Sequence, residues 1–297
     1  MFSEIDLETE NKFTLLTIGD SFSEQGGMSY QNYIASPEIS VLHYDRFLHE
    51  NPIETVNGLL NGDVLNKLKV DYIILQSVER SFVSRGMEVN KKTVTIKDSL
   101  KKLIIQHGEK EADKKEDTKD KFFNRDIILF PLNTIANSFN CKAYGSRTYQ
   151  VDTKSDLFIT HNKKLLFLDD DYSILPVNND INNVKTLNNE LNSLAKRLQE
   201  KGIKLIVIPS PDKLDFYYDE IVNKEEFPRP LFFDHIRSLN KAYLFIDAKK
   251  ILREKAAEGI KDLYFYDDTH WSPVSTKFIG AFIKNEIQRN GTTQKPL

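Results

Sequence analysis

Two short stretches near opposite ends of the chain hold residue types suited to nucleophilic catalysis. Gly19-Asp20-Ser21 ends an apolar run, and "YFYDDTHWSP" carries His270 close behind two aspartates. A serine hydroxyl is a weak nucleophile at neutral pH and needs a general base, which in turn needs an orienting carboxylate. Taken alone, each stretch is typical of a turn, a helix cap or a metal-ligand pair. Together they predict a catalytic triad with Ser21 as nucleophile and His270 as general base.

Folding must bring the two motifs together, although 249 positions separate them (270 − 21). The apolar runs Phe13–Ile18 and Val70–Leu75 predict buried strands, and Asn61–Lys69 between them predicts a helix. Such alternation predicts a parallel sheet, in which the loops after the strands gather at one edge. Ser21 follows the first strand and the histidine motif follows the apolar stretch Leu263–Tyr266, so both are expected at that edge. The polar run after the serine is expected to open a helix, whose unpaired N–H groups would stabilise an oxyanion.

The remaining elements continue this alternation around an irregular middle section. Helices are expected at Asn183–Lys201, Asp247–Ala257 and Val274–Gln288, and strands in "IKLIVIPSP" and at Glu38–Leu42, Thr55–Val56 and Tyr243–Ile246. Because residues 81–171 break the rhythm, we expect a single domain over residues 1–297 with an insertion at 81–171. Within that insertion the sequence predicts a solvated helix or loop at Glu109–Lys121, a strand at Ile127–Pro131, and a hairpin pairing Leu157–Thr160 with Leu165–Leu168.

Composition and charge exclude several classes of function. A net charge of -3 and a pI near 6.1 give no electrostatic indication of nucleic-acid binding, so no nucleic-acid partner is expected. Cys141 is the single cysteine, so no intrachain disulfide can form. No apolar run reaches the roughly 18–20 residues of a membrane span, and the polar, acidic N-terminus does not have the pattern of a signal peptide. We expect no metal and no cofactor, and interpret Asp169–Asp171 as a polar turn.

The two motifs resemble those of the SGNH/GDSL hydrolase superfamily, which contains esterases, lipases and acetyltransferases. The resemblance rests on Gly19-Asp20-Ser21-Phe22 and on an aspartate shortly before His270. It implies a flavodoxin-like three-layer α/β/α fold around a parallel sheet. It also implies that a glycine of a second block donates its backbone N–H to the oxyanion together with that of the serine. In "VNGLLNGDVLNKL" this glycine is expected to be Gly62, with Gly58 as the alternative.

A narrower resemblance follows from the third family block, Gly-x-Asn-Asp, which this chain lacks. "IILQSVERSF" stands in its place, so Glu79-Arg80 replaces the usual oxyanion asparagine. Together with "GDSFS" and "DDTHWS", this stretch resembles the alginate O-acetyltransferase-like branch of the superfamily. In that branch the Asp-Thr-His-Trp block precedes the serine block, whereas here the serine comes first. The chain would then be a circular permutation relative to that branch, or a sibling line.

The resemblance also implies roles for further residues. The Asp-x-His pattern of the branch makes Asp268 the orienting carboxylate, whereas the wider Asp-x-x-His pattern makes it Asp267; we take Asp268. Arg80 is expected either to meet the acyl oxygen or the acceptor sugar, or to form a structural ion pair. Trp271 is expected either to stack on a sugar or to pack on the last helix. Lys213 matches a lysine of the branch, and is expected to line the cleft or to be solvated.

The resulting functional expectation is acyl transfer on carbohydrate, with polysaccharide O-acetylation through an acetyl-serine intermediate. The resemblance implies a polysaccharide or oligosaccharide substrate, a membrane-bound acyltransferase as acetyl donor, and a location outside the cytoplasmic membrane. A carbohydrate acetylesterase is the first alternative, because water can replace the sugar hydroxyl. A degenerate glycan-binding or assembly subunit is the second, because the block-three asparagine is missing.

Overall fold

The computed structural model describes residues 1–117 and 148–292 of the chain. Its central element is a parallel sheet whose strands stand in the order β2-β1-β3-β6-β7. The bounds of these strands are β1 Asn11–Ile18, β2 Val41–Tyr44, β3 Leu68–Val78, β6 Lys204–Ser210 and β7 Leu244–Phe245. Ranked by sequence within the sheet, this order is 2-1-3-4-5, which is the order of flavodoxin-like doubly wound folds. The predicted fold class is therefore confirmed.

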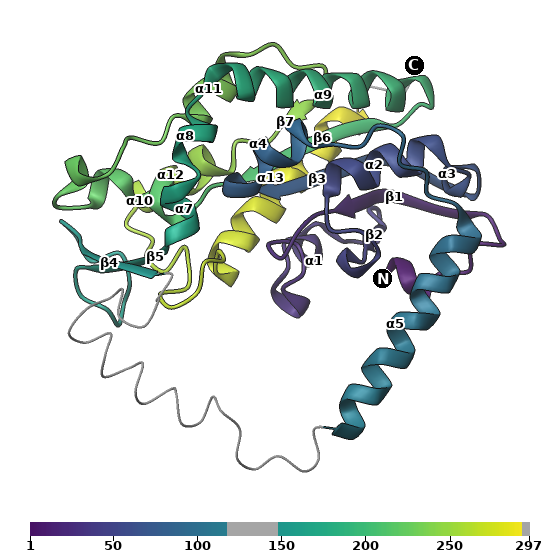
Figure 1. Cartoon of the computed structure of the whole chain (residues 1–297), viewed down its shortest axis with the longest axis horizontal. Helices are drawn as coiled ribbons and strands as arrows, with labels where there is room; N and C mark the ends of the chain where they lie inside the picture. Colours follow the sequence, from purple (N-terminus) through teal and green to yellow (C-terminus); the bar gives the residue numbers. More distant parts are fainter. Residues whose placement is uncertain (118–147, 293–297) are drawn as a thin grey trace.

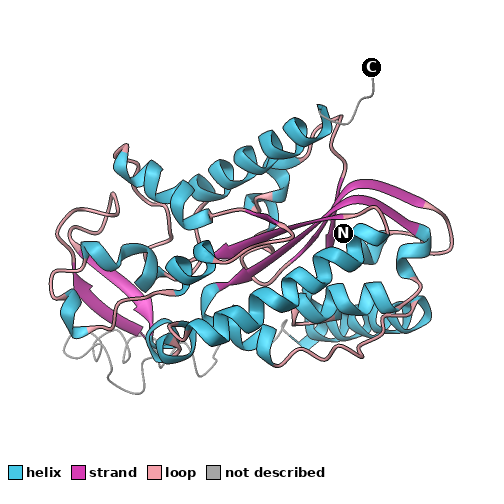
Figure 2. Cartoon of the chain, turned by 90° about the horizontal axis from the view of Figure 1, so that it is seen from above, coloured by secondary structure: helices cyan, strands magenta, loops and turns pink. Residues whose placement is uncertain are grey.

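Helices cover both faces of the sheet (Figure 2). Their bounds are α1 Gln31–Ile34, α2 Pro52–Asn61, α3 Val64–Lys67, α4 Glu79–Met87, α5 Lys97–Asp117, α7 Asp169–Ser173, α8 Leu175–Asn178, α9 Ile181–Glu200, α10 Lys213–Tyr217, α11 Phe232–Ser238, α12 Ala248–Ala257 and α13 Pro273–Thr292. A separate antiparallel pair, β4 (Thr148–Asp152) and β5 (Lys164–Leu168), lies at the end of the molecule opposite α5 (Figure 1). Within the two described ranges, no helix combines the length and the apolar character that crossing a bilayer demands.

Alternate residues of each strand face opposite sides of the sheet, and each side has its own core. Leu16 and Val207 pack on one side with residues of α2, α3, α4, α9 and α11. Leu15 and Ile206 pack on the other side with residues of α1, α10, α12 and α13. The strands thus lie between two helical layers, as the α/β/α resemblance implied. Burying an aliphatic side chain stabilises the fold by about 1.5–3 kcal/mol, so these cores fix the positions of the strand ends.

Three neighbouring strands deliver residues to the carboxyl edge of the sheet. Ser21 lies shortly after β1, Arg80 after β3, and Lys213 after β6. The register is continuous across these strands, so their ends stand side by side. His270 comes from the loop between α12 and α13, which returns to the same edge. The expectation that both chemical motifs meet at one edge of a parallel sheet therefore agrees with the architecture.

Some local predictions are wrong. Leu263–Tyr266 forms no strand, and this segment contributes only an isolated bridge between Tyr264 and Trp271. Thr55–Val56 lies inside α2, because Asn51 caps that helix by accepting from the backbone N–H of Ile53 at 3.0 Å. The strand β5 pairs with β4 and not with residues 157–160.

The middle section, residues 81–171, combines described and undescribed segments. Phe82 and Val83 of α4 lie in the core on one face of the sheet, so the start of this range packs with the main fold. The helix predicted within Glu109–Lys121 coincides with the end of α5 as far as Asp117. The predicted strand Ile127–Pro131 and Cys141 lie outside the described residues. That residues 81–171 form an insertion in a single domain stays a prediction.

Candidate active site

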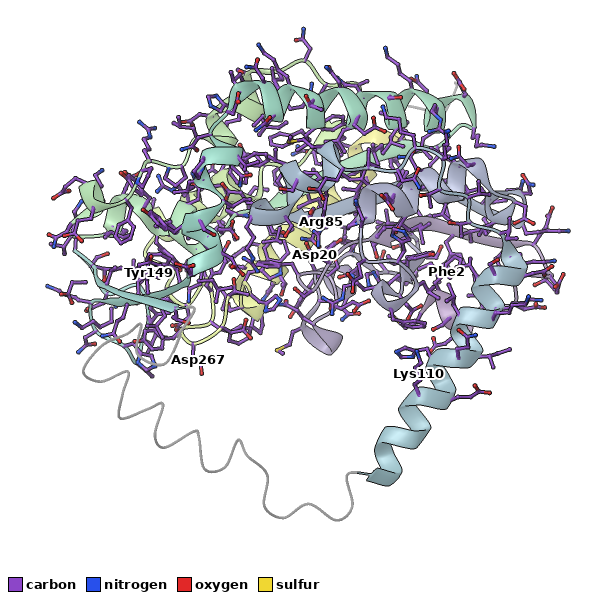
Figure 3. All side chains as sticks on the ribbon, in the orientation of Figure 1. Phe2, Asp20, Arg85, Lys110, Tyr149 and Asp267 are labelled. Carbon is purple, nitrogen blue, oxygen red and sulfur yellow. The ribbon has the colours of Figure 1, made fainter. Side chains whose placement is uncertain are left out.

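Ser21 lies in a tight turn directly after β1, and not at the start of a helix as expected. The backbone N–H of Ser23 closes this turn by donating to the carbonyl of Asp20 at 2.9 Å. The Asp20 carboxylate supports it from both oxygens: Oδ1 accepts from the N–H of Phe22 at 3.1 Å, and Oδ2 accepts from Nη1 of Arg85 at 2.7 Å. Figure 3 shows Asp20 and Arg85 together at the centre of the molecule. The serine is thus presented by a turn with fixed geometry.

The turn is packed too closely on β3 for any side chain at position 19. A Cβ added to Gly19 would stand 2.1 Å from Ser23 Oγ and 2.5 Å from Gln76 Oε1. That oxygen accepts from Ser23 Oγ at 2.8 Å and from the backbone N–H of Asp20 at 3.1 Å. The amide nitrogen of Gln76 donates to Ser210 Oγ, at the end of β6, at 2.9 Å. Gln76, which the sequence reading missed, therefore ties the serine turn to two neighbouring strands.

The structure brings Ser21, His270 and Asp268 into one hydrogen-bonded chain. Nε2 of His270 lies 2.7 Å from Ser21 Oγ, and Nδ1 of the same ring lies 2.5 Å from Asp268 Oδ1. The same carboxylate oxygen accepts from the backbone N–H of His270 at 3.0 Å. Asp267 is exposed and lies at the lower edge of the molecule in Figure 3. Among the described residues no hydrogen bond joins it to the imidazole, whose Nδ1 is bonded to Asp268. Of the two aspartates that the sequence left open, the geometry brings Asp268 to the histidine.

The electrostatics of the pair match this arrangement. Burial raises the pKa of Asp268, but hydrogen bonds from the backbone and ring of His270 outweigh it and bring this pKa below its usual value. An ionised carboxylate beside Nδ1 favours the tautomer with its proton on Nδ1. Nε2 is then free to accept the proton of the Ser21 hydroxyl.

Aromatic packing holds the two motifs together around the triad. The Phe22 ring lies 4.7 Å from the His270 ring and 5.3 Å from Trp271, measured between centroids. Trp271 Nε1 donates to the carbonyl of Phe22 at 3.2 Å, and the Gln25 amide donates to the carbonyl of Trp271 at 3.2 Å. Because Trp271 is fully buried and also packs edge-on against Tyr30, the prediction that it stacks on a sugar is wrong.

Lys213 contacts the loop that carries the histidine. Its side chain is buried, with the residue only 1% exposed, and Nζ donates to the backbone carbonyls of Phe265, Tyr266 and Asp268 at 2.9, 2.8 and 3.1 Å. Burial lowers the pKa of Lys213 to about 8. The expectation of a solvated lysine is wrong, because the ammonium donates to the loop backbone. Lys213 also lines a small hollow together with Asp268.

Arg80 is bound to buried acids. Its Nη1 lies 2.6 Å from Asp212 Oδ1 and 3.2 Å from Asp171 Oδ1, and it donates to Thr269 Oγ1 at 3.1 Å. Burial opposes the charged form, but the two carboxylates outweigh it and raise the pKa of Arg80. The guanidinium charge of Arg80 is thus already neutralised by two carboxylates and does not meet an acyl oxygen or a sugar. Of the two expectations for Arg80, the structural ion pair is the one observed. Asp171 belongs to the acidic run that we interpreted as a polar turn, and it is buried.

Glu79, the neighbour of Arg80, completes this buried cluster. Burial, followed by repulsion from Asp215 and Asp212, raises the pKa of Glu79 well above its usual value. Its Oε2 accepts from the backbone N–H of Asp212 at 3.0 Å. Glu79 therefore keeps its proton at pH values where an exposed glutamate is ionised.

Glu79→Gln should become increasingly stabilising as the pH rises. Because the pKa of Glu79 in the folded chain lies above its unfolded value, the unfolded chain loses this proton first, and wild-type stability falls with pH between the two values. Glutamine removes this titration and can still accept from the Asp212 N–H. We expect the free energy of unfolding of Glu79→Gln, measured relative to that of the wild type, to increase by up to about 1.4 kcal/mol for each pH unit.

Urea unfolding from about pH 5 to about pH 8 measures this difference. Glu88→Gln, at an exposed position at the end of α4, provides the matched control. A difference between Glu79→Gln and wild type that does not change with pH would contradict the buried titration.

Gly62 lies away from the site. Its backbone N–H donates to the carbonyl of Gly58 at 2.9 Å, as the cap of α2. This helix begins after the carboxyl end of β2 and runs back toward the amino ends of the strands, so Gly62 lies at the opposite edge from Ser21. A Cβ on Gly62 would stand 1.7 Å from the carbonyl oxygen of Thr95, which explains the glycine by packing.

The prediction of an oxyanion donor at Gly62, or at Gly58 within the same helix, is therefore wrong. The backbone N–H of Ser21 has no acceptor within hydrogen-bond distance among the described residues. Of the two backbone N–H groups that were expected to bind the oxyanion, the N–H of Ser21 is the one that the structure leaves available.

Sequence reasoning assigned no supporting role to five residues that hold the site together, namely Phe22, Gln76, Asp171, Asp212 and Thr269. Asp212 had a usable signal, because it follows β6 as closely as Arg80 follows β3. The other contacts join distant segments and leave no local pattern. Within the described ranges, no group of three or more His, Cys, Asp or Glu side chains is arranged to hold a metal ion.

Comparison with known proteins gives one match. Residues 163–296 match the family model described as the SGNH hydrolase-like domain of acetyltransferase AlgX. This range contains His270, Asp268 and Lys213, whereas Ser21 lies outside it. Searches of the curated proteins and of the solved structures gave no match.

Proposed function

Residues 163–296 match the family model of the SGNH hydrolase-like domain of acetyltransferase AlgX, and on this premise we propose that the protein is a serine-dependent polysaccharide O-acetyltransferase. The observation that carries the proposal is the hydrogen-bonded chain from Ser21 Oγ through the imidazole of His270 to Asp268, with distances of 2.7 and 2.5 Å. Its two halves come from opposite ends of the sequence, and one half lies outside the matched range. A binding module has no need of this alignment.

The proposed reaction has two steps. Nε2 of His270 takes the proton of Ser21 while Oγ attacks the carbonyl carbon of an acetyl donor. The ring then returns the proton to the leaving group, which departs and leaves an acetyl ester on the serine. In the second step His270 takes the proton of a sugar hydroxyl, whose oxygen attacks this ester and carries the acetyl group away, and the proton returns to Oγ.

The chain's own groups support both steps. The backbone N–H of Ser21, which has no acceptor among the described residues, donates to the oxyanion of each tetrahedral intermediate in this proposal, and the Asp268 carboxylate stabilises the imidazolium that forms. The acceptor in this proposal is a polysaccharide or oligosaccharide. The acetyl donor in this proposal is a membrane-bound acyltransferase, and the reaction takes place outside the cytoplasmic membrane, both as the family resemblance implies.

A carbohydrate acetylesterase is the second candidate function. The Asp268 side chain is 53% exposed and that of His270 21% exposed, so solvent reaches the triad in the chain on its own. Water would then remove the acetyl group from the serine. The two functions share the first step and differ only in the group that accepts the acetyl.

The test is a time course with p-nitrophenyl acetate, with and without candidate oligosaccharides, on the wild type and on Ser21→Ala. Acetylated oligosaccharide detected by mass spectrometry, and lost in Ser21→Ala, is the result expected for a transferase. Free acetate alone, again dependent on Ser21, would identify an esterase. Absence of serine-dependent ester turnover together with intact glycan binding would identify a degenerate binding or assembly subunit and overturn the proposal.

A further inference from the structure

Lys213 is a buried lysine that forms no ion pair among the described residues. An ammonium has three N–H donors, and here each is matched by one backbone carbonyl. The three carbonyls belong to the single loop Phe265–His270, which carries the acid and the base of the triad. One of them is the carbonyl of Asp268 itself. A fully buried lysine without a paired acid is rare, so its presence here requires a reason.

The geometry points to Lys213 as the positioning residue that holds Asp268 and His270 against Ser21. This inference rests on the proposed function for the roles of those residues. Inside the loop, the one backbone–backbone hydrogen bond runs from the N–H of Phe265 to the carbonyl of His270, at 3.1 Å. The carbonyls of Phe265, Tyr266 and Asp268 converge on Nζ of Lys213, and they would repel one another without a cation between them.

The position of Lys213 in the fold explains how it performs this task. It follows β6, which is bonded to β3, which in turn is bonded to β1 with its serine turn. The ammonium therefore anchors the loop to the same sheet edge that holds Ser21. Arg80, after β3, donates to Thr269 Oγ1 and gives the loop a second contact with the sheet edge. Burial lowers the pKa of Lys213 to about 8, so the site bears the cost of desolvating this cation.

The test compares Lys213→Met with Lys249→Met. Lys249 is also a largely buried lysine, but its ammonium bonds the Asp215 carboxylate at 2.5 Å and does not contact the loop. Two readouts are used. The first is the downfield proton resonance of His270 Nδ1, which reports the bond to Asp268 without any substrate. The second is the kcat and KM for p-nitrophenyl acetate.

We expect Lys213→Met to lose the resonance and to lower kcat by about 10- to 100-fold with little change in KM. Lys249→Met should lose thermal stability but keep both the resonance and kcat. Retention of the resonance in Lys213→Met, or its equal loss in both variants, would overturn the inference. Where Lys213→Met does not fold, Lys213→Gln retains two uncharged donors, and a resonance identical to that of the wild type would overturn the inference in the same way.

The two readouts separate this inference from the proposed function. A wild type without serine-dependent acyl chemistry, combined with a resonance that depends on Lys213, would overturn the function and support the positioning role. A wild type with full activity, combined with a resonance and a kcat that do not depend on Lys213, would do the reverse.

Discussion

Alanine in place of Ser21 should lower kcat/KM for an acetyl ester by on the order of 10⁴-fold or more, because it removes the oxygen that forms the acyl-enzyme. The Ser21 Oγ lies 2.7 Å from the base, and no other hydroxyl is hydrogen-bonded to the His270 ring among the described residues. The double variant Ser21→Ala/His270→Ala should lose little more than either single variant, since nucleophile and base act as a unit. Initial rates with p-nitrophenyl acetate and single-turnover acetylation followed by intact mass measure both effects.

Ser40→Ala is the matched control for this experiment. Ser40 precedes β2 and accepts from the backbone N–H of Thr14 at 2.9 Å, near the amino ends of the strands. The variant Ser40→Ala therefore loses a serine hydroxyl at the edge of the sheet opposite the site, and its activity should match that of the wild type. Full activity in Ser21→Ala, or an additive loss in the double variant, would contradict a triad built on this serine.

Much of this site could be predicted because its chemical residues occur in short local patterns. Ser21 follows a run of apolar residues that forms a buried strand, and that run is long enough to predict β1 without other information. His270 closely follows two aspartates, so the sequence alone limited the orienting carboxylate of the triad to Asp267 or Asp268. The meeting of these motifs followed from a general property of parallel sheets, whose strands end at one edge.

The predictions that were wrong concern groups whose partners lie far away in the sequence. The letters around Gly62 do not show that its N–H is already used by Gly58 at the end of a helix. The sequence around Trp271 is compatible with a sugar-stacking ring, but in the fold Phe22 and Tyr30 pack against this ring and bury it. For Arg80 the sequence left a substrate contact and a structural ion pair open, and the fold supplies the acids of the ion pair. Lys213 was expected to line the cleft or to be solvated, whereas the fold supplies backbone carbonyls to its ammonium.

The family match and the geometry support each other for a similar reason. The matched range, residues 163–296, contains the acid and the base but not the nucleophile. Ser21 reaches them only because β1 lies beside β3, and β3 beside β6, in the observed strand order. A chain in which the serine block comes first can therefore assemble the same triad, since the sheet edge and not the sequence order determines which residues meet.

Asparagine in place of Asp268 should lower kcat by on the order of 10³-fold, somewhat less than the roughly 10⁴-fold loss known for a buried triad aspartate. The amide keeps the shape of the carboxylate but bears no charge, so it no longer stabilises the imidazolium. Its NH₂ group can also donate to Nδ1, which favours the tautomer with the proton on Nε2 and removes the acceptor that Ser21 needs. The loss is smaller here because the Asp268 side chain is 53% exposed, and water partly replaces its charge.

Asp267→Asn decides whether this loss reports the triad or only the charge of the loop. Asp267 precedes Asp268 in the same exposed segment, and its replacement removes the same charge. Its kcat for p-nitrophenyl acetate should stay within about twofold of the wild type, in keeping with the small effects of exposed charges. Equal losses in the two variants would show that the loop acts through its net charge. A loss confined to Asp268→Asn would instead require the directed bond to Nδ1, because that bond is the difference between two adjacent aspartates of identical chemistry.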